Sequence, residues 1–234
     1  KSGPFGEDSD QKIETVEVLV VAIHKNILDD YKTISTQMGL SIKPFEIETL
    51  SAIRAVSSHD LSAMVIIDMG ASSTRVVVVD YGVARVAHTI NKGSQDITIA
   101  LSKSLGMDFV KAEEIKRKVG AVGKADGLSS QGPGGQGSDL LNIINPTTDY
   151  ILFEASRIIL SYQKKYSRSV GKAILIGGGA LLKGFSDIAA KSLEMDVKLG
   201  DPFKKLEAPA ILEPVLVGAG PSFAVAIGVA LRDL

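Results

Sequence analysis

The segment Ile66–Gly82, which reads IIDMGASSTRVVVVDYG, constrains the fold more than any other part of the chain. Two apolar runs, the second rich in valine, stand on either side of a short turn of small residues. Such runs favour buried strands, and the turn between them predicts a hairpin in the core. The turn also carries the carboxylate of Asp68 and several hydroxyl groups, which a simple connection does not need. The hairpin is therefore a candidate ligand site.

The rest of the chain alternates between strand and helix patterns. Apolar periodicity and turn signals predict strands over 16–23, 40–47, 64–69, 75–80, 83–90, 173–176 and 197–199. They predict helices over 26–38, 50–56, 96–105, 108–119, 146–166, 181–193 and 222–231. The segment 120–138 holds seven glycines without an apolar period, which indicates a flexible loop. Alternation at both ends of a hairpin-rich middle predicts an α/β fold with a mixed sheet.

Composition excludes several classes of function. The net charge is −1, so the chain offers no basic surface for nucleic acid. The absence of cysteine excludes disulfides, thiolate metal sites and thiol nucleophiles. The uncharged stretch 214–231 is rich in glycine and alanine and is interrupted by Pro221, which favours a packed core helix over a membrane span. The polar opening KSGPFGEDSD is not a secretory signal.

The hairpin turn has the chemistry of a phosphate site. Gly70 allows a sharp turn, and the small residues after it leave peptide N–H groups uncovered for phosphate oxygens. The hydroxyl groups of Ser72, Ser73 and Thr74 can add hydrogen bonds. Asp68, at the end of a buried strand, can hold Mg²⁺ through water. An ordinary Asp/Gly/Ser hairpin explains these residues equally well.

A triple glycine, Gly177 to Gly179, separates a buried strand from a predicted helix. Three glycines cost backbone entropy, so a close approach to the chain is expected there. A nucleotide lying across a helix N-terminus would explain them, and so would a tight strand–helix turn. The dinucleotide fingerprint GxGxxG is absent, because Leu182 occupies the place of its third glycine.

A third candidate is the pair Glu113 and Lys116 in the predicted helix over 108–119. The two residues lie three positions apart and therefore on one face of the helix. They can hold a ribose or a base, although an ordinary surface ion pair has the same spacing.

Taken in order, these motifs resemble those of the actin-like ATPases. The DxGxxxT hairpin, the AExxK helix, the GGGA turn and the small-residue helix over 220–230 resemble the second phosphate motif, the adenosine-side helix, the adenosine motif and the second connecting helix. Within this superfamily, GASST, NKGSQDIT, GGGALLKGF, the D-P-F after a short strand and GPSFAVAIG are similar to the type IV pilus assembly protein PilM family. The cell-division protein FtsA is a near neighbour. The resemblance spans 16–231.

The resemblance implies an actin-like, ribonuclease H-like fold in which two lobes clamp a nucleotide between two phosphate hairpins. Residues 1–60 would form part of the inserted subdomain of FtsA and PilM and the first connecting helix. Residues 61–107 and 171–234 would form the nucleotide-facing subdomain of the second lobe, and 108–170 its outer insertion. The first phosphate hairpin is expected upstream of Lys1, so the chain is expected to be a fragment with an incomplete clamp.

The resemblance also implies ATP and Mg²⁺ as ligands. Asp68 would face the metal, and Glu113 and Lys116 would hold the ribose side. The phosphates would lie on Gly70, Ala71, Ser72, Ser73 and Thr74, and the adenosine on Gly177, Gly178 and Gly179. Ala71 and Ser72 stand where many members carry an acid or glycine, which predicts weak ATPase activity at most. No catalytic residue is assigned.

The implied role is that of a cytoplasmic component of type IV pilus or type II secretion assembly, peripheral to the inner membrane through its partners. The expected partner is the N-terminal peptide of a PilN-like inner-membrane protein, with self-association as a further expectation. Two alternatives stay open. One is an FtsA-like membrane-tethering filament protein, and the other is a scaffold that works without nucleotide.

Overall fold

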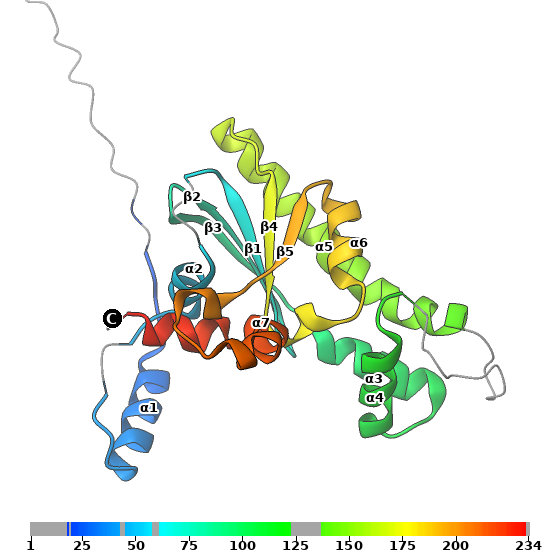
Figure 1. Ribbon diagram of the computed structural model, residues 1–234, viewed down its shortest axis with the longest axis horizontal. Coiled ribbons are helices and arrows are strands. Elements are labelled where there is room, and N and C mark those ends of the chain that lie inside the picture. Colours follow the sequence, from blue (N-terminus) through cyan, green and yellow to red (C-terminus); the bar gives the residue numbers. More distant parts are fainter. Residues whose placement is uncertain (1–17, 19, 43–44, 58–60, 123–136, 233–234) are drawn as a thin grey trace, which may run out of the picture. The chain divides into compact units, whose positions relative to one another are not determined.

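The computed structural model describes residues 18, 20–42, 45–57, 61–122 and 137–232 (Figure 1). The chain divides into two compact units, Lys1–Phe45 and Glu46–Leu234. The larger unit contains the sheet and the candidate site residues.

The first unit contains helix α1, Lys25–Gln37. The helix forms where Ile27, Tyr31, Ile34 and Met38 recur at helical spacing, and each of these side chains is at least 44% exposed. The predicted strands over 16–23 and 40–47 are wrong wherever the structure describes those residues, because none of them is in a strand. A strand is stable only when its backbone pairs with a neighbour, and no described residue of either segment pairs with the sheet.

The second unit is built on a mixed five-stranded sheet. Its strands are β1 Met64–Met69, β2 Thr74–Asp80, β3 Val83–Ile90, β4 Lys172–Ile176 and β5 Asp196–Leu199. The strand order is β3-β2-β1-β4-β5. β1–β2 and β2–β3 are antiparallel, whereas β1–β4 and β4–β5 are parallel. The prediction of a mixed sheet is therefore confirmed.

Helices cover both faces of this sheet. They are α2 Glu48–Val56, α3 Ser94–Leu105, α4 Phe109–Val119, α5 Gly137–Tyr166, α6 Phe185–Leu193 and α7 Glu213–Ala230. Short 3-10 helices span η1 Gly178–Leu181, η2 Pro202–Lys205 and η3 Ala210–Leu212. Most of the predicted glycine-rich loop, residues 123–136, lies outside the described residues.

Two helices begin nine residues earlier than predicted, because each continues through a proline. Pro146 lies inside α5 and Pro221 inside α7. Proline removes a backbone hydrogen bond and usually ends a helix. In α5, the buried side chains of Ile144 and Ile151 lie on both sides of the proline, so packing outweighs that cost. In α7, Pro221 and Ala224 are themselves buried.

The core has two parts, one on each face of the sheet. Val65, Ile67 and Met69 of β1 belong to a large cluster with residues of α3, α4, α5 and α6. Met64 and Ile66 face the other way, into a smaller cluster with α2 and α7. Figure 1 shows α2 and α7 on one side of the sheet and α5 and α6 on the other. The side chains of β1 thus alternate between the two faces of the sheet, as expected for a strand that is buried on both faces.

Within the described residues, the stretch Ala210–Ala230 is long and apolar enough to cross a membrane, with a mean hydropathy of 1.7. In this structure its C-terminal half packs tightly against α2. A Cβ atom at Gly228 would lie 1.9 Å from the carbonyl oxygen of Ser51, so only glycine allows the two helices to lie this close. Ala224 of the same helix belongs to the smaller core cluster, and Ile227 is also buried.

Candidate functional site

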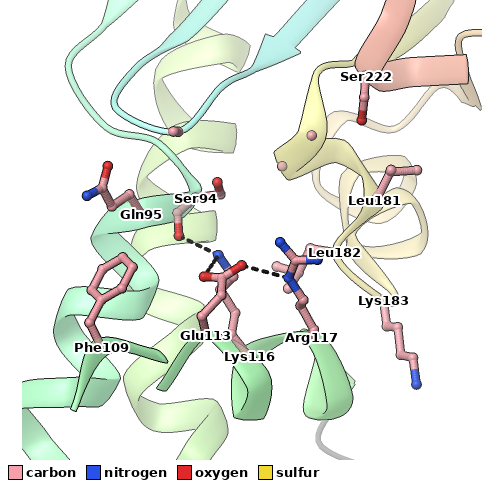
Figure 2. Close-up of a pocket in the computed structure, with 13 residues that line it drawn as sticks. Ser94, Gln95, Phe109, Glu113, Lys116, Arg117, Leu181, Leu182, Lys183 and Ser222 are labelled. Atoms are coloured by element: carbon pink, nitrogen blue, oxygen red, sulfur yellow. Dashed lines mark hydrogen bonds and ion pairs between the residues drawn. The ribbon is translucent and has the colours of Figure 1, made fainter. Parts of the chain in front are cut away.

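A pocket of about 860 Å³ lies beside the carboxyl ends of the parallel strands β1 and β4. The hairpin turn, the start of α3, one face of α4, the glycine turn and α7 all contribute to its walls (Figure 2). Five of the predicted site residues line it, namely Ala71, Glu113, Lys116, Gly178 and Gly179. Segments more than a hundred residues apart in the sequence therefore meet around one cavity. The carboxyl edge of parallel strands is where α/β proteins commonly bind ligands.

The hairpin turn is fastened to the start of α3. The backbone N–H groups of Ser94 and Gln95 donate to the carbonyl oxygens of Gly70 and Ala71 over 3.0 and 2.9 Å. Gly93 has to be glycine, since a Cβ atom there would lie 2.3 Å from the Ala71 carbonyl oxygen. Backbone contacts therefore fix the turn against the start of α3, and the Gly70 N–H donates within the turn to the Ser73 carbonyl oxygen over 3.0 Å.

The hydroxyl side chains of the turn differ in their surroundings. The Thr74 side chain is buried, and its Oγ1 donates to the carbonyl oxygen of Lys92 over 2.8 Å. Ser72 is exposed and Ser73 is half-buried. Thr74 therefore closes the hairpin against the loop before α3, whereas Ser72 is exposed to solvent and is not one of the residues that line the pocket.

Asp68 lies near the end of β1 and does not line the pocket. It is directly across from Arg75 on β2, and Arg75 Nη1 lies 3.3 Å from its Oδ2. Arg75 also pairs with Glu48 of α2. Burial raises the pKa of the Asp68 carboxyl, Arg75 opposes this rise, and the nearby Glu48 adds to it. Asp68 is thus a largely buried carboxylate, and its main cationic partner, Arg75, also pairs with Glu48.

Among the described residues, no three His, Cys, Asp or Glu side chains gather as a metal site. Mg²⁺ is commonly held by one or two carboxylates together with phosphate oxygens and water. A single carboxylate such as Asp68 fits this pattern, because a nucleotide would supply the remaining oxygen ligands.

Two of the three glycines in the turn are required by the protein itself. Gly177 has a φ of +83°, and its N–H donates to the Pro221 carbonyl oxygen over 2.8 Å. A Cβ atom at Gly179 would lie 2.5 Å from Cγ of Met69. Gly178 is different, because its nearest neighbour is Oγ of Ser222 at 3.8 Å. It is thus at Gly178 that the turn leaves space for a ligand.

The helix predicted to begin at Leu181 begins later. The residues after Gly177 form the short 3-10 helix η1, and α6 starts at Phe185 after Gly184, whose φ is +75°. A left-handed residue at this position interrupts the α-helical hydrogen bonding, which separates η1 from α6. The glycines therefore do not stand at the N-terminus of an α-helix.

Glu113 and Lys116 form a partly buried ion pair in the pocket wall. Nζ of Lys116 lies 2.7 Å from Oε2 of Glu113, and the Lys116 side chain is 7% exposed. Nζ of Lys116 also donates to the Ser94 carbonyl oxygen and to Oγ1 of Thr98, over 3.1 and 3.0 Å. All three ammonium protons of Lys116 are therefore taken up within the protein, and its role is to hold Glu113 and α3 in place.

Glu113 is the carboxylate that faces this cavity. Burial alone would raise its pKa, but hydrogen bonds from Lys116, Thr98 and Arg117 outweigh that effect and lower the pKa to about 2. At neutral pH Glu113 is an ionised hydrogen-bond acceptor, well suited to hydroxyl groups of a sugar and poorly suited to proton transfer.

Several residues of the pocket were not predicted as site residues. Arg117 and Lys183 line the pocket from opposite walls, and the other unpredicted lining residues are Ser94, Gln95, Phe109, Leu181, Leu182 and Ser222. The N–H of Ala121 donates to the Lys183 carbonyl oxygen over 2.8 Å, which ties α4 to the facing wall. The sequence NKGSQ at the start of α3 could have pointed to Ser94 and Gln95 as site residues. A charged residue on a helix, such as Arg117, has no sequence pattern that marks it as part of a site.

The chain is similar in sequence to cell division proteins. A protein-family model described as cell division protein FtsA matches residues 65–228. The cell division protein FtsA of Helicobacter pylori is 26% identical over 234 residues, which cover 92% of this chain and 47% of that protein. The chain thus spans about half the length of the curated relatives it matches.

Solved structures show the same fold. The PilM-PilN type IV pilus biogenesis complex superposes with a TM-score of 0.74 at 20% identity, covering 89% of this chain and 58% of that one. MreB 5 of Spiroplasma citri bound to AMPPNP superposes with a TM-score of 0.67 at 14% identity, covering 90% and 65%. The predicted actin-like fold is confirmed by these similarities.

Proposed function

Because the chain belongs to the FtsA family of actin-like proteins, we propose that it binds ATP in the pocket between its hairpin turn and its glycine turn. One observation carries the proposal. Ala71, Glu113 and Gly178, which come from three distant motifs, line a single cavity. Nucleotide complexes of structural neighbours, such as MreB 5 with AMPPNP, lend support. Residues 61–107 and 171–234 then serve as the nucleotide-facing part of one lobe, with 108–170 as its outer insertion.

Each motif has a separate role in this proposal. The turn from Gly70 to Thr74 holds the phosphates through its open backbone and the hydroxyl of Ser72, and Thr74 secures the turn. Gly177 to Gly179 pass beneath the adenosine, with Gly178 in contact with it. Glu113 accepts hydrogen bonds from the ribose, and Lys116 fixes Glu113.

Asp68 is the proposed carboxylate for Mg²⁺. Mg²⁺ bound with the nucleotide would neutralise phosphate charge. Asp68 supplies a negative charge at the end of β1, and a cation there would compete with Arg75 for it. No side chain of the pocket is assigned as a general base, so the proposed activity is slow ATP hydrolysis at most.

In the cell, the proposed role is in type IV pilus assembly or a related type II secretion system. The protein would work on the cytoplasmic side of the inner membrane and pass its nucleotide state to the N-terminal peptide of a PilN-like protein. Two observations support this role. The fold matches the PilM-PilN complex with a TM-score of 0.74, and the sequences of several motifs are similar to those of the PilM family. Residues 1–60 are the proposed contact region.

Cell division is the second candidate, favoured by a different observation. Both the family model and the curated relatives are cell division proteins. In this case the protein would self-associate and act as an FtsA-like membrane-tethering filament.

Calorimetry tests the shared part of these proposals. Titration of the full-length protein with ATP in the presence of Mg²⁺ is expected to give a saturable, Mg²⁺-dependent binding isotherm. No binding would contradict nucleotide binding and favour a scaffold that works without nucleotide.

A second titration separates the two cellular roles. The probe is the N-terminal peptide of the PilN-like protein from the same organism, added to the ATP-loaded protein. Binding supports the pilus role. ATP binding without peptide binding contradicts it and leaves the cell-division role in place.

A further inference from the structure

The outer face of the long helix α5 carries large apolar side chains in addition to those on its inner face. The inner face of α5 packs into the larger core cluster. On the opposite face Tyr150, Phe153 and Leu160 are each at least 48% exposed. Single exposed apolar residues are normal on a protein surface, but a row of large ones marks an interaction site. None of the three lines the pocket, so this face is separate from the proposed nucleotide site.

Two cationic residues continue this row along the helix. From Tyr150 through Arg157 to Lys164, the row advances in steps of three, four, three and four residues. This is the spacing of the contact positions in a coiled coil, and it keeps the side chains on one side of the helix. A row with this spacing fits a second helix that lies along α5.

The charges of the outer face are separated along the helix. Asp149 is exposed near its beginning, and Lys164 is exposed near its end. Between them, the Arg157 side chain is 65% exposed, whereas that of its ion-pair partner Glu154 is 16% exposed. The face is therefore acidic at one end and basic from its middle to the other end. A lipid surface would favour cations along the whole face, and the exposed acid argues against it.

We propose that the outer face of α5 binds a second copy of this chain, with the two helices antiparallel about a two-fold axis. Only an antiparallel copy has its acidic end beside the basic end of α5 and its basic end beside the acidic one. With the axis at the level of Ala155, Tyr150 lies against the partner's Leu160. Phe153 then lies against the partner's Arg157, which is a favourable contact between a guanidinium and an aromatic ring.

The ionic contacts of this arrangement follow from the direction of helical side chains. Asp149 is level with the partner's Ser161, and the partner's Lys164 lies one turn beyond it. Side chains on a helix lean toward its N-terminus, so in antiparallel helices these two side chains lean toward each other. The two-fold axis repeats the contact, which gives two such ion pairs in each dimer.

The size of the face sets the strength of the dimer. A helix of 30 residues is about 45 Å long and about 10 Å wide, so one face covers roughly 450 Å². Stable interfaces bury about 800 Å² on each partner, so a dissociation constant above about 1 µM is expected. The dimer closes at two copies, whereas a filament requires two different faces and continues. The inference therefore goes beyond the proposed functions and requires no nucleotide.

Sedimentation equilibrium of the full-length protein without nucleotide tests the apolar part of the face. The weight-average mass is expected to rise from one protomer toward two as concentration increases. Phe153→Ser is expected to weaken dimerisation by at least about tenfold, since an aromatic side chain at the centre of an interface contributes strongly. Val110→Ser, at a 67% exposed position of α4, is the matched control and is expected to dimerise as the wild type does.

A charge exchange tests the antiparallel register. Asp149→Lys and Lys164→Asp are each expected to weaken dimerisation severalfold, because each replaces two attractive contacts with two repulsive ones. The double variant, with both substitutions in one chain, is expected to recover most of the wild-type affinity. The two residues are fifteen positions apart on one helix, so recovery has to come from contacts between chains.

Three results would overturn the proposal. One is a wild-type protein that stays a single protomer at every concentration, which would leave the face to a different protein. Another is a wild-type assembly that Phe153→Ser does not weaken. The third is a double charge-exchange variant that dimerises no better than the single variants. None of these results affects the nucleotide site, which the ATP titration tests separately.

Discussion

At the scale of single residues, the three adjacent glycines of the turn have different reasons to be glycine. The structure leaves no space for a Cβ atom at Gly177 or Gly179, and open space at Gly178. Gly178→Ala is therefore expected to leave the free energy of unfolding within about 1 kcal/mol of the wild type, while lowering ATP affinity at least severalfold. Denaturant unfolding and calorimetry measure the two effects.

Gly179→Ala is the control for this comparison. The added methyl group would meet Met69, so a loss of about 2 kcal/mol or more in the free energy of unfolding is expected. A Gly178→Ala protein that binds ATP as tightly as the wild type would show that the nucleotide does not contact this turn.

Asp68 gives a second prediction at the same scale. Asp68→Asn keeps the size of the side chain but removes the charge, so affinity for Mg·ATP is expected to fall about tenfold or more. Affinity for ATP in EDTA is expected to stay the same, since only the metal would be lost. Glu48→Gln removes the other partner of Arg75 and serves as the control. Equal Mg·ATP affinity in the wild type and in Asp68→Asn would remove Asp68 from the site.

At the scale of elements, two glycines of helix α7 differ in how closely other parts of the chain approach them. Gly228 lies directly against the backbone of Ser51 in α2, whereas a methyl group added at Gly218 would have no neighbour within 4 Å. Gly228→Ala is expected to force α7 away from α2 and to lower the free energy of unfolding by about 2–4 kcal/mol. Gly218→Ala, in the same helix, is expected to raise it by about 0.5–1 kcal/mol.

Thermal or urea unfolding of the two variants checks this pair. Equal stabilities would contradict the close packing of α7 on α2, whatever the sign of the common change.

Sequence patterns predicted all five strands of the sheet to within one residue, whether their partners are local or distant. β1, β2 and β3 follow one another along the chain, and the strands over 64–69 and 83–90 begin and end where they were predicted. In the described parts of 16–23 and 40–47 no strand forms, because apolar, β-branched runs show only a preference, while pairing requires a neighbouring strand that the pattern does not reveal.

The same contrast applies to the candidate site. The hairpin and the glycine turn carry local signals, because glycine and hydroxyl residues mark tight turns. Arg117 and Phe109 enter the pocket only because α4 packs on α3 and its end meets Lys183, just after η1, which no local pattern encodes. The burial of Lys116 has the same origin, since Thr98 and Ser94 of α3 reach it through tertiary packing.

At the scale of the whole molecule, two acidic side chains make stability depend on pH. The pKa of Glu113 is about 2, because hydrogen bonds overcome the effect of burial. The pKa of Glu46 is also about 2, chiefly because Arg54 donates to it. Both values lie below the ordinary 4.5, so each group stabilises the folded protein above about pH 4.5 and loses that contribution as pH falls toward 2.

The free energy of unfolding is therefore expected to decrease between about pH 4.5 and pH 2. Glu113→Gln should lower stability at pH 7 by on the order of 2 kcal/mol and make the decrease shallower. Glu114→Gln is the control, because Glu114 is 63% exposed and lies 4.0 Å from Lys118. Urea unfolding over a pH series measures the effect. A pH dependence unchanged in Glu113→Gln would contradict it.

The hydrogen bond from Gly177 to Pro221 connects the pocket to the long helix that runs beneath it. Proline has no N–H, so α7 lacks one internal hydrogen bond at this point and is easiest to bend there. The carbonyl of that same residue is the one that holds the glycine turn. A ligand that shifts the turn would therefore pull at the weakest point of α7, and the two halves of the helix would pivot. Since the C-terminal half is locked to α2 through Gly228, the movement would be carried to α2, a helix that does not line the pocket.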